Sequence, residues 1–331
     1  MQQLGLDAFQ VGFVLVGAWL GSQTKSSRAC RFAFLALLGL GSIYLGWAGL
    51  NMVSPEVARL SPINASGRQA LAIAYCLTAI ASGLLLMPST RRIVMRTFGW
   101  DLQAPERILG TWLFIIMLFV NVTLLLIASS YTIMLVANGA GHNNPLVNEV
   151  ARELSYLIIA IVGAGLYFRR SLPAVIERLG LDELCFEWER TLAVAGIVGG
   201  GVLLSVLGAS ILKHYDIAAY NSLRFTINSS LPYNDGNMAQ IVILALAVGL
   251  VAGIGQEILF RGLLQPTFGL LPTTLLYTAL HSQYGLSPAI ALVFVSGLAF
   301  GWLRQRYSTW AAIIAHIACT TLCIVLWWTI V

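Results

Sequence analysis

The segment from Gly253 to Gln265 carries ionisable side chains inside a long apolar run. It reads Gly-Ile-Gly-Gln-Glu-Ile-Leu-Phe-Arg-Gly-Leu-Leu-Gln and continues an apolar stretch that begins near Ala239. A charged side chain in a transmembrane segment costs about 2.5 kcal/mol or more by insertion scales, so it must face protein or water. Glu257 and Arg261 are four residues apart, which places them on one helical face where each can neutralise the other. A structural ion pair would also explain them, but their position within the membrane favours a functional site.

Two histidines lie in the apolar stretches that follow this segment. His281 stands four residues after Tyr277, and His316 stands four residues before Thr320. An acid and two histidines around water indicate hydrolysis, because the acid or a histidine can act as general base and another donor can stabilise the oxyanion. A lone histidine in such a place is often only a packing residue, but two of them with an acid in neighbouring segments favour a site.

The set Glu257, His281 and His316 is also an inventory of zinc ligands. The chain has no His-Glu-x-x-His motif, and the ligands would come from three helices. We therefore expect no cofactor and keep zinc as an alternative. No serine or cysteine nucleophile is indicated, because Cys319 follows His316 by three residues and would point obliquely away from it.

The three residues can meet only if they lie at one depth in the membrane. Counted from expected helix ends at positions 265, 272 and 309, Glu257, His281 and His316 lie about 12, 13 and 10 Å deep at 1.5 Å per residue. This agreement requires a short helix at 272–284, broken by Gly285 and Pro288 within the membrane. Broken helices are tolerated where they line a buried or wet cavity. We therefore predict one polar cavity that opens towards the cytoplasm.

The composition is that of a polytopic membrane protein. Of its 331 residues, 58% are hydrophobic and only 10% are charged, whereas soluble domains carry about 25% charged residues. The net charge is +5, but the basic residues stand between apolar runs, which is the positive-inside pattern and not a nucleic-acid patch. The five cysteines form no CxxC pair, and no disulfide framework is indicated.

Apolar runs of membrane-spanning length predict an all-α polytopic bundle of about ten membrane segments, some short or broken around the polar cavity. The runs fall near residues 8–22, 32–53, 70–88, 110–137, 152–168, 191–212, 239–265, 289–303 and 309–330, with a shorter one at 272–284. Residues 172–190 mix apolar and charged side chains and predict an amphipathic interfacial linker anchored by Trp188. The linker separates an N-terminal membrane region of about five spans (1–171) from a membrane core (191–331). Within that core, Gly249 and Gly253 would let a neighbouring helix approach closely.

Clusters of basic residues between the runs predict the orientation, because cytoplasmic connections carry an excess of Lys and Arg. The segment 138–148 has no Lys or Arg and is expected outside, as are both ends of the chain. The clusters are Lys25, Arg28 and Arg31, then Arg91, Arg92 and Arg96, then Arg169 and Arg170, and finally Arg304 and Arg306.

Taken together, the motifs resemble the type II CAAX prenyl protease family, also called the CAAX protease and bacteriocin-processing (CPBP) family of intramembrane glutamic endopeptidases. The resemblance covers roughly residues 175–331 and leaves the first five spans outside it. Three motifs stand in the family's order, namely Gln256-Glu257-x-x-x-Arg261, Tyr277-x-x-x-His281 and His316-x-x-x-Thr320.

The resemblance implies a role for each motif. His281 would partner the general base in holding the attacking water, His316 would donate to the oxyanion, and Arg261 would brace the acidic pair. The family's base is a glutamate, where this chain has Gln256, which cannot accept a proton. The rate contribution of the general base would then be lost unless Glu257 acts as the base instead. Glu257 is turned about 100° around the helix from Gln256.

Two further positions differ from the family's pattern. Thr320 replaces an asparagine but keeps a hydroxyl donor, so it forfeits at worst an oxyanion contact of about 3–4 kcal/mol. Tyr277 replaces a phenylalanine, which is a milder change.

The resemblance implies an endopeptidase of the bacterial plasma membrane that hydrolyses a peptide bond in a membrane-associated or prenylated substrate. Its partners would be that substrate and the lipid bilayer, with no nucleic acid. A catalytically silent member of the family, acting as a membrane binding or scaffold protein, is the alternative that Gln256 and Thr320 raise. A transporter is the third hypothesis, since buried charges also mark ion pathways, but no inverted repeat supports it.

Overall fold

The computed structural model describes residues 2–61, 63–100, 102–139, 145–166, 170–182, 187–217, 220–221, 224 and 237–329. Over these residues the regular secondary structure is helical, apart from one isolated bridge between Leu166 and Arg170. The predicted all-α class is therefore confirmed.

The helices of the first part of the chain are α1 (Gln2–Gln23), α2 (Arg28–Met52), α3 (Pro55–Leu60), α4 (Ala65–Leu84), α5 (Pro88–Phe98), α6 (Pro105–Gly139), α7 (Pro145–Gly163) and α8 (Leu172–Leu179). Those of the second part are α9 (Trp188–Tyr215), α11 (Met238–Glu257), the π-helix η1 (Ile258–Leu264), α12 (Gln265–Phe268), α13 (Leu270–Ala279), the 3-10 turn η2 (Ser282–Tyr284), α14 (Pro288–Arg306) and α15 (Thr309–Thr329).

Six helical stretches among the described residues are long and apolar enough to cross a membrane. Helices α4 and α5, bent by 99° at their junction, would make a seventh span if they are taken together. The protein is thus an integral, multi-pass membrane protein, while the expected total of about ten segments stays a prediction. The six stretches are Arg28–Met52, Pro105–Ile127, Trp188–Tyr215, Met238–Phe268, Pro288–Arg306 and Thr309–Thr329.

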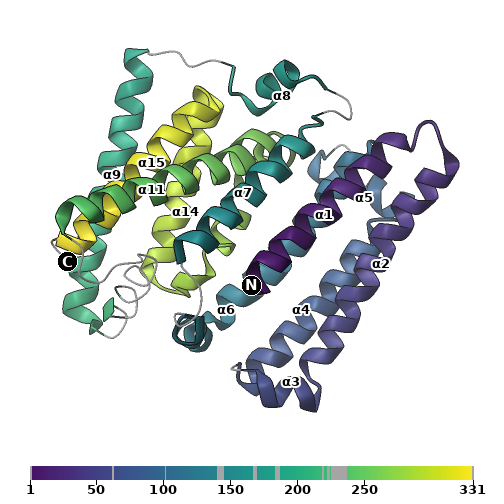
Figure 1. Ribbon diagram of the computed structural model, residues 1–331, viewed down its shortest axis with the longest axis horizontal. Coiled ribbons are helices and arrows are strands. Elements are labelled where there is room, and N and C mark those ends of the chain that lie inside the picture. The colour runs from purple at the N-terminus through teal and green to yellow at the C-terminus, as the bar shows by residue number, and fades with distance from the viewer. Residues whose placement is uncertain are drawn as a thin grey trace.

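The helices form one continuous bundle in which both parts of the chain share contacts (Figure 1). The pair α2 and α4 lies at one end of the long axis, and α9, α11, α14 and α15 gather at the other, with α1, α6 and α7 between them. Helix α7 packs on α11 and η1, and α6 packs on α13 and η2. The predicted N-terminal region therefore supplies one wall of the core that the motifs occupy. The predicted division at residues 171 and 190 stays untested.

Close packing of α11 on α15 rests on two glycines, as expected. A Cβ atom at Gly249 would lie 2.6 Å from Oγ1 of Thr321, and one at Gly253 would lie 2.6 Å from Cγ1 of Ile317. Only glycine admits this approach, and the approach brings the segment after Gly253 directly against α15, where His316 lies.

The segment after α11 differs from the expected single α-helix over 239–265. Helix α11 begins with a capping box between Asn237 and Gln240, and it passes without a break into the π-helix η1, which ends where Gln265 N–H bonds to the carbonyl of Phe260. A π-helix inserts an extra residue per turn and is often found at functional sites.

The short helix that was expected over 272–284 is shorter still. Helix α13 ends at Ala279, and His281 lies two residues beyond it with φ −93° and ψ 35°, at the start of η2. Gly285 follows with φ +56°, a left-handed value that glycine adopts without strain. The expectation that His281 sits on a helix was wrong. The break before α14 at Pro288 was expected correctly.

Arginines from four separate segments gather at one end of the bundle. Burial lowers the pKa of Arg178 on α8, and neighbouring guanidinium groups lower it further. Those groups belong to Arg170, Arg107 and Arg304. The start of α6, the connection after α7 and the end of α14 therefore lie at the same end of the bundle. The basic clusters at Arg170 and Arg304 predict this, because both were expected on the same side of the membrane.

The predicted interfacial linker is described only in part, because residues 183–186 lie outside the described ranges. Its helix α8 buries Val175 and Leu179 and exposes Leu172, whereas Trp188 is the first residue of α9 and is exposed. The segment is tied to α15, since the Thr309 hydroxyl and the Trp310 indole N–H donate to main-chain carbonyls at 179 and 181. These bonds fix the start of the helix that carries His316.

Candidate active site

Glu257 is the centre of a buried ionic cluster. Its Oε2 accepts a hydrogen bond from Nε of Arg261 at 3.0 Å, and its Oε1 accepts one from Nδ1 of His316 at 2.8 Å. The side chains of Glu257 and Arg261 have no exposed surface. The predicted pairing of Glu257 with Arg261 is confirmed, and His316 joins them from α15. Both carboxylate oxygens are thus already occupied.

Arg261 is contacted by several of the surrounding helices. Its guanidinium lies over the ring of Tyr277, with Cζ 5.1 Å from the ring centroid, which is a cation–π distance. Gln265 lies 3.5 Å from its Nη1 and in turn donates to the carbonyl of Gly301 on α14 at 2.8 Å. The charge of Arg261 is therefore offset by Glu257 on α11, and its guanidinium is also in contact with Gln265 on α12 and Tyr277 on α13.

The Tyr277 ring lies close to both histidine rings. Its centroid lies 4.8 Å from that of His281 and 6.3 Å from that of His316, and Phe300 stacks on His316 at 5.1 Å. Nδ1 of His281 lies 2.8 Å from the carbonyl oxygen of Tyr277. Since a carbonyl oxygen only accepts, this Nδ1 carries the hydrogen, and Nε2 of the neutral ring is left as an acceptor.

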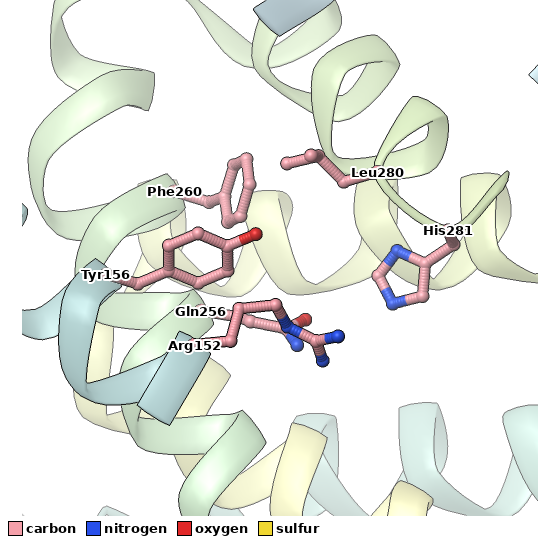
Figure 2. A pocket seen from close by; sticks show the side chains of 6 residues that line it. All are labelled: Arg152, Tyr156, Gln256, Phe260, Leu280 and His281. Atoms are coloured by element: carbon pink, nitrogen blue, oxygen red, sulfur yellow. The ribbon is translucent and has the colours of Figure 1, made fainter. Parts of the chain in front are cut away.

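A small cavity of about 250 Å³, which includes space open to the surroundings, lies beside this cluster (Figure 2). Its lining residues are Arg152, Tyr156, Gln256, Phe260, Leu280 and His281. Figure 2 shows the imidazole of His281 on one side of this space, with the side chains of Arg152, Tyr156 and Gln256 directed into it from the other. The enclosed part of this space has room for about one water molecule, which is far below the size of a typical ligand site.

Helix α7 contributes two charged residues that sequence reasoning missed. Glu153 is 2% exposed and accepts a hydrogen bond from Nε2 of Gln256 at 2.8 Å. Arg152, beside it, contacts both Glu153 and Glu149. In the sequence, Glu149, Arg152 and Glu153 form a cluster of ionisable residues near the start of the fifth apolar run. Their spacing gives no sign of a contact with Gln256, which follows Glu153 by 103 residues.

The remaining predicted site residue, Thr320, lies half-buried on α15 one turn after His316. The zinc alternative stays untested; in this structure Oε1 of Glu257 is paired with His316 and Oε2 with Arg261. Among the described residues, no group of three or more His, Cys, Asp or Glu side chains is placed to hold a metal ion.

Residues 238–322 match the family model described as type II CAAX prenyl endopeptidase Rce1-like. The resemblance to the type II CAAX prenyl protease family is confirmed over this segment. It holds all three motifs, from Gln256 to Thr320, so the ionic cluster and His281 lie inside it. No curated protein and no solved structure matches the chain.

Residues 238–322 of this membrane protein are therefore similar to a family of CAAX-type endopeptidases. Helix α7, with Arg152 and Glu153, lies outside the matched residues. The cavity is thus lined both by residues of the matched segment and by residues of α7, which lies outside the match.

Proposed function

We propose that the protein is an intramembrane endopeptidase that hydrolyses a peptide bond in a membrane-associated or prenylated substrate. The observation that carries the proposal is the match to the CAAX prenyl endopeptidase family over the segment that lines the cavity with Gln256 and His281. The lipid part of such a substrate would remain in the bilayer while the scissile bond enters the cavity. The cavity is proposed to open towards the cytoplasm.

In this proposal His281 is the general base. Gln256 has no group that can take a proton, and both oxygens of Glu257 are engaged by Arg261 and His316. Nε2 of His281 is a basic nitrogen that lines the cavity and can accept a proton, because Nδ1 donates to a main-chain carbonyl. A positioned general base contributes about 10²–10⁴ in rate.

His316 is proposed to donate to the oxyanion of the tetrahedral intermediate. Its Nδ1 donates to Glu257, so Nε2 is the nitrogen left for the substrate, and Nε2 donates only when the ring is protonated. Glu257 at 2.8 Å is the counter-ion for that protonated form, and Arg261 holds Glu257 in place. Thr320, on the same helix, is proposed as a second donor.

A catalytically silent membrane binding protein is the second candidate function, and Gln256 is the observation that favours it. An amide at the position of the family's glutamate removes the group that accepts the proton there. The cavity, the ionic cluster and the family segment would then serve to capture a lipidated peptide without cutting it.

Cleavage of a peptide library by the purified protein in liposomes tests both functions. For a peptidase, the wild type cuts, His281→Ala lowers kcat by about 10²-fold or more, and the matched control His214→Ala, on an exposed histidine at the end of α9, cuts normally. If only Gln256→Glu cuts, while the wild type binds peptide, the chain is a silent binder. A chelator added to the wild type tests for a metal.

A further inference from the structure

Glu153 on α7 lies behind the cavity in direct contact with Gln256. Its Oε1 accepts from Nε2 of Gln256 at 2.8 Å, and Nε and Nη2 of Arg152 lie 3.3 and 3.2 Å from the same oxygen. Its Oε2 is buried with no hydrogen-bond partner among the described residues. Glu153 does not line the cavity, so it acts there only through its neighbours.

The contact with Glu153 decides which way the amide of Gln256 faces. Oε1 of Glu153 also accepts from Arg152 and therefore carries no proton, so the NH₂ group of Gln256 must point at it. The carbonyl oxygen of the amide, Oε1, is therefore turned away from it. This Oε1 is buried and has no hydrogen-bond partner within the described part of the chain, although Gln256 lines the cavity. A buried acceptor left in this state indicates a donor that binds there.

Gly255 lets the carboxylate reach this place. A Cβ atom at Gly255 would lie 2.6 Å from Oε2 of Glu153 and 2.8 Å from its main-chain oxygen. Helices α7 and α11 can therefore approach closely only because position 255 has no side chain. The arrangement brings a carboxylate from outside the family segment to the position next to the family's missing glutamate.

We propose that Glu153 is a positioning residue that holds the Gln256 amide so that Oε1 accepts a hydrogen bond from the attacking water. This inference rests on the proposed peptidase function. The water gives a proton to Nε2 of His281 as its oxygen bonds to the peptide carbonyl carbon, and the carbonyl π electrons move to the oxygen. When the intermediate collapses, the C–N bond breaks and the protonated His281 returns the proton to the leaving amine. A carboxylic acid and an amine result, with no other reactant.

The test compares Glu153→Leu with Glu153→Gln in liposomes. Leucine removes the acceptor and frees the amide, and we expect kcat to fall by about 10²-fold with KM within about twofold, because a misplaced reacting group costs about that much. Glutamine keeps an oxygen that can accept from Gln256, so it should restore most of kcat. A role in folding alone would lower the amount of folded protein and leave kcat per folded molecule unchanged. Glu149→Gln, which contacts Arg152 but not Gln256, is the matched control and should cut normally.

A second test exchanges the two side chains. Gln256→Glu alone places two carboxylates side by side and should lower activity. The double variant Gln256→Glu with Glu153→Gln again has one amide and one carboxylate, and its activity should return to within about tenfold of the wild type, since contacting residues couple. If the wild type cuts and Glu153→Leu cuts equally well, this inference is wrong while the proposed function stands. The same holds if the effects of the two single substitutions simply add in the double variant. If the wild type and all variants fail to cut, the proposed function falls and this inference with it.

Discussion

The cluster of Glu257, Arg261 and His316 carries two charged side chains with no contact to water. Such a pair is not a source of large net stability, because both charges lose their hydration when they are buried. Removing one partner is a different matter, since it leaves the other charge uncompensated in the interior. Substituting one member of the cluster alone should therefore be poorly tolerated.

Glu257→Gln should lower the free energy of unfolding by about 3–5 kcal/mol, because Arg261 would keep its charge without a counter-ion. Thermal or denaturant unfolding of the protein in detergent micelles measures this loss. Glu56→Gln, on an exposed glutamate in the first turn of α3, is the matched control and should change stability by less than about 0.5 kcal/mol. Equal effects of the two substitutions would contradict the buried pairing.

Tyr277→Phe should keep most of the activity, because the contacts of Tyr277 with Arg261, His281 and His316 are made by its ring. Tyr277→Ala removes that ring from between the motifs and should reduce kcat by at least about tenfold, since cation–π and ring contacts are lost together. Steady-state kinetics on one cleaved peptide compares the two. A phenylalanine variant as slow as the alanine variant would mean that the hydroxyl group carries the function.

At this scale, sequence reasoning succeeded where the contact is local or follows from a motif. The four-residue spacing of Glu257 and Arg261 predicted their pairing, and the motifs predicted that His316 lies near Glu257, which it contacts. The bond between Gln256 and Glu153 was missed, because it joins residues 103 positions apart and no periodic pattern connects them. The sequence showed that position 256 carries an amide, which cannot take up a proton, but not which helix lies beside it.

At the scale of elements, the geometry depends on how closely α7 and α15 approach the two sides of α11. Gly255 faces α7, and Gly249 and Gly253 face α15, so glycines on different faces of α11 set both distances. The π-helix η1 then shifts Arg261 and Gln265 relative to a regular helix. Sequence patterns do not predict such a π-helix, since its extra residue is accommodated by tertiary contacts. The end of α13 before His281 was misplaced for a similar reason.

Gly255→Ala should push α7 away from α11 and lower both stability and activity, because its Cβ would lie 2.6 Å from Oε2 of Glu153. Overpacking of this kind typically costs about 1–3 kcal/mol. Gly196→Ala on α9, where no described atom lies within 4 Å of the added Cβ, is the matched control and should not destabilise the protein. Unfolding in micelles measures both, and a neutral Gly255→Ala would show that the two helices are not in close contact.

At the scale of the whole molecule, the arginines gathered near α8 lie together on one face of the bundle, which we expect to face the cytoplasm. The positive-inside rule predicted this for the connections near Arg170 and Arg304, and their proximity to Arg178 agrees with it. The number of spans was harder to predict, because helices such as α1 and α13 are short or partly polar, and length alone does not decide whether they cross.

Cysteine labelling tests the orientation. In a variant without the five native cysteines, Arg306→Cys, at the end of α14, should react with a membrane-impermeant maleimide only in inside-out vesicles. Met238→Cys, at the start of α11, should react only in right-side-out vesicles or intact cells, because α11 and η1 carry the chain across. Reversed labelling would place the basic face outside and contradict the proposed cytoplasmic opening.

The contact between α7 and α11 also limits how this protein can be recombined with others. A chimera that grafts residues 238–322 onto the amino-terminal helices of another family member would inherit Gln256 without the carboxylate that faces it here. Conversely, a chain that inherits α7 but has glutamate at position 256 would bring two acids together. Substitutions at 153 and 256 should therefore be found to change together across homologous chains, so that a single replacement in either helix is poorly tolerated while the paired exchange survives.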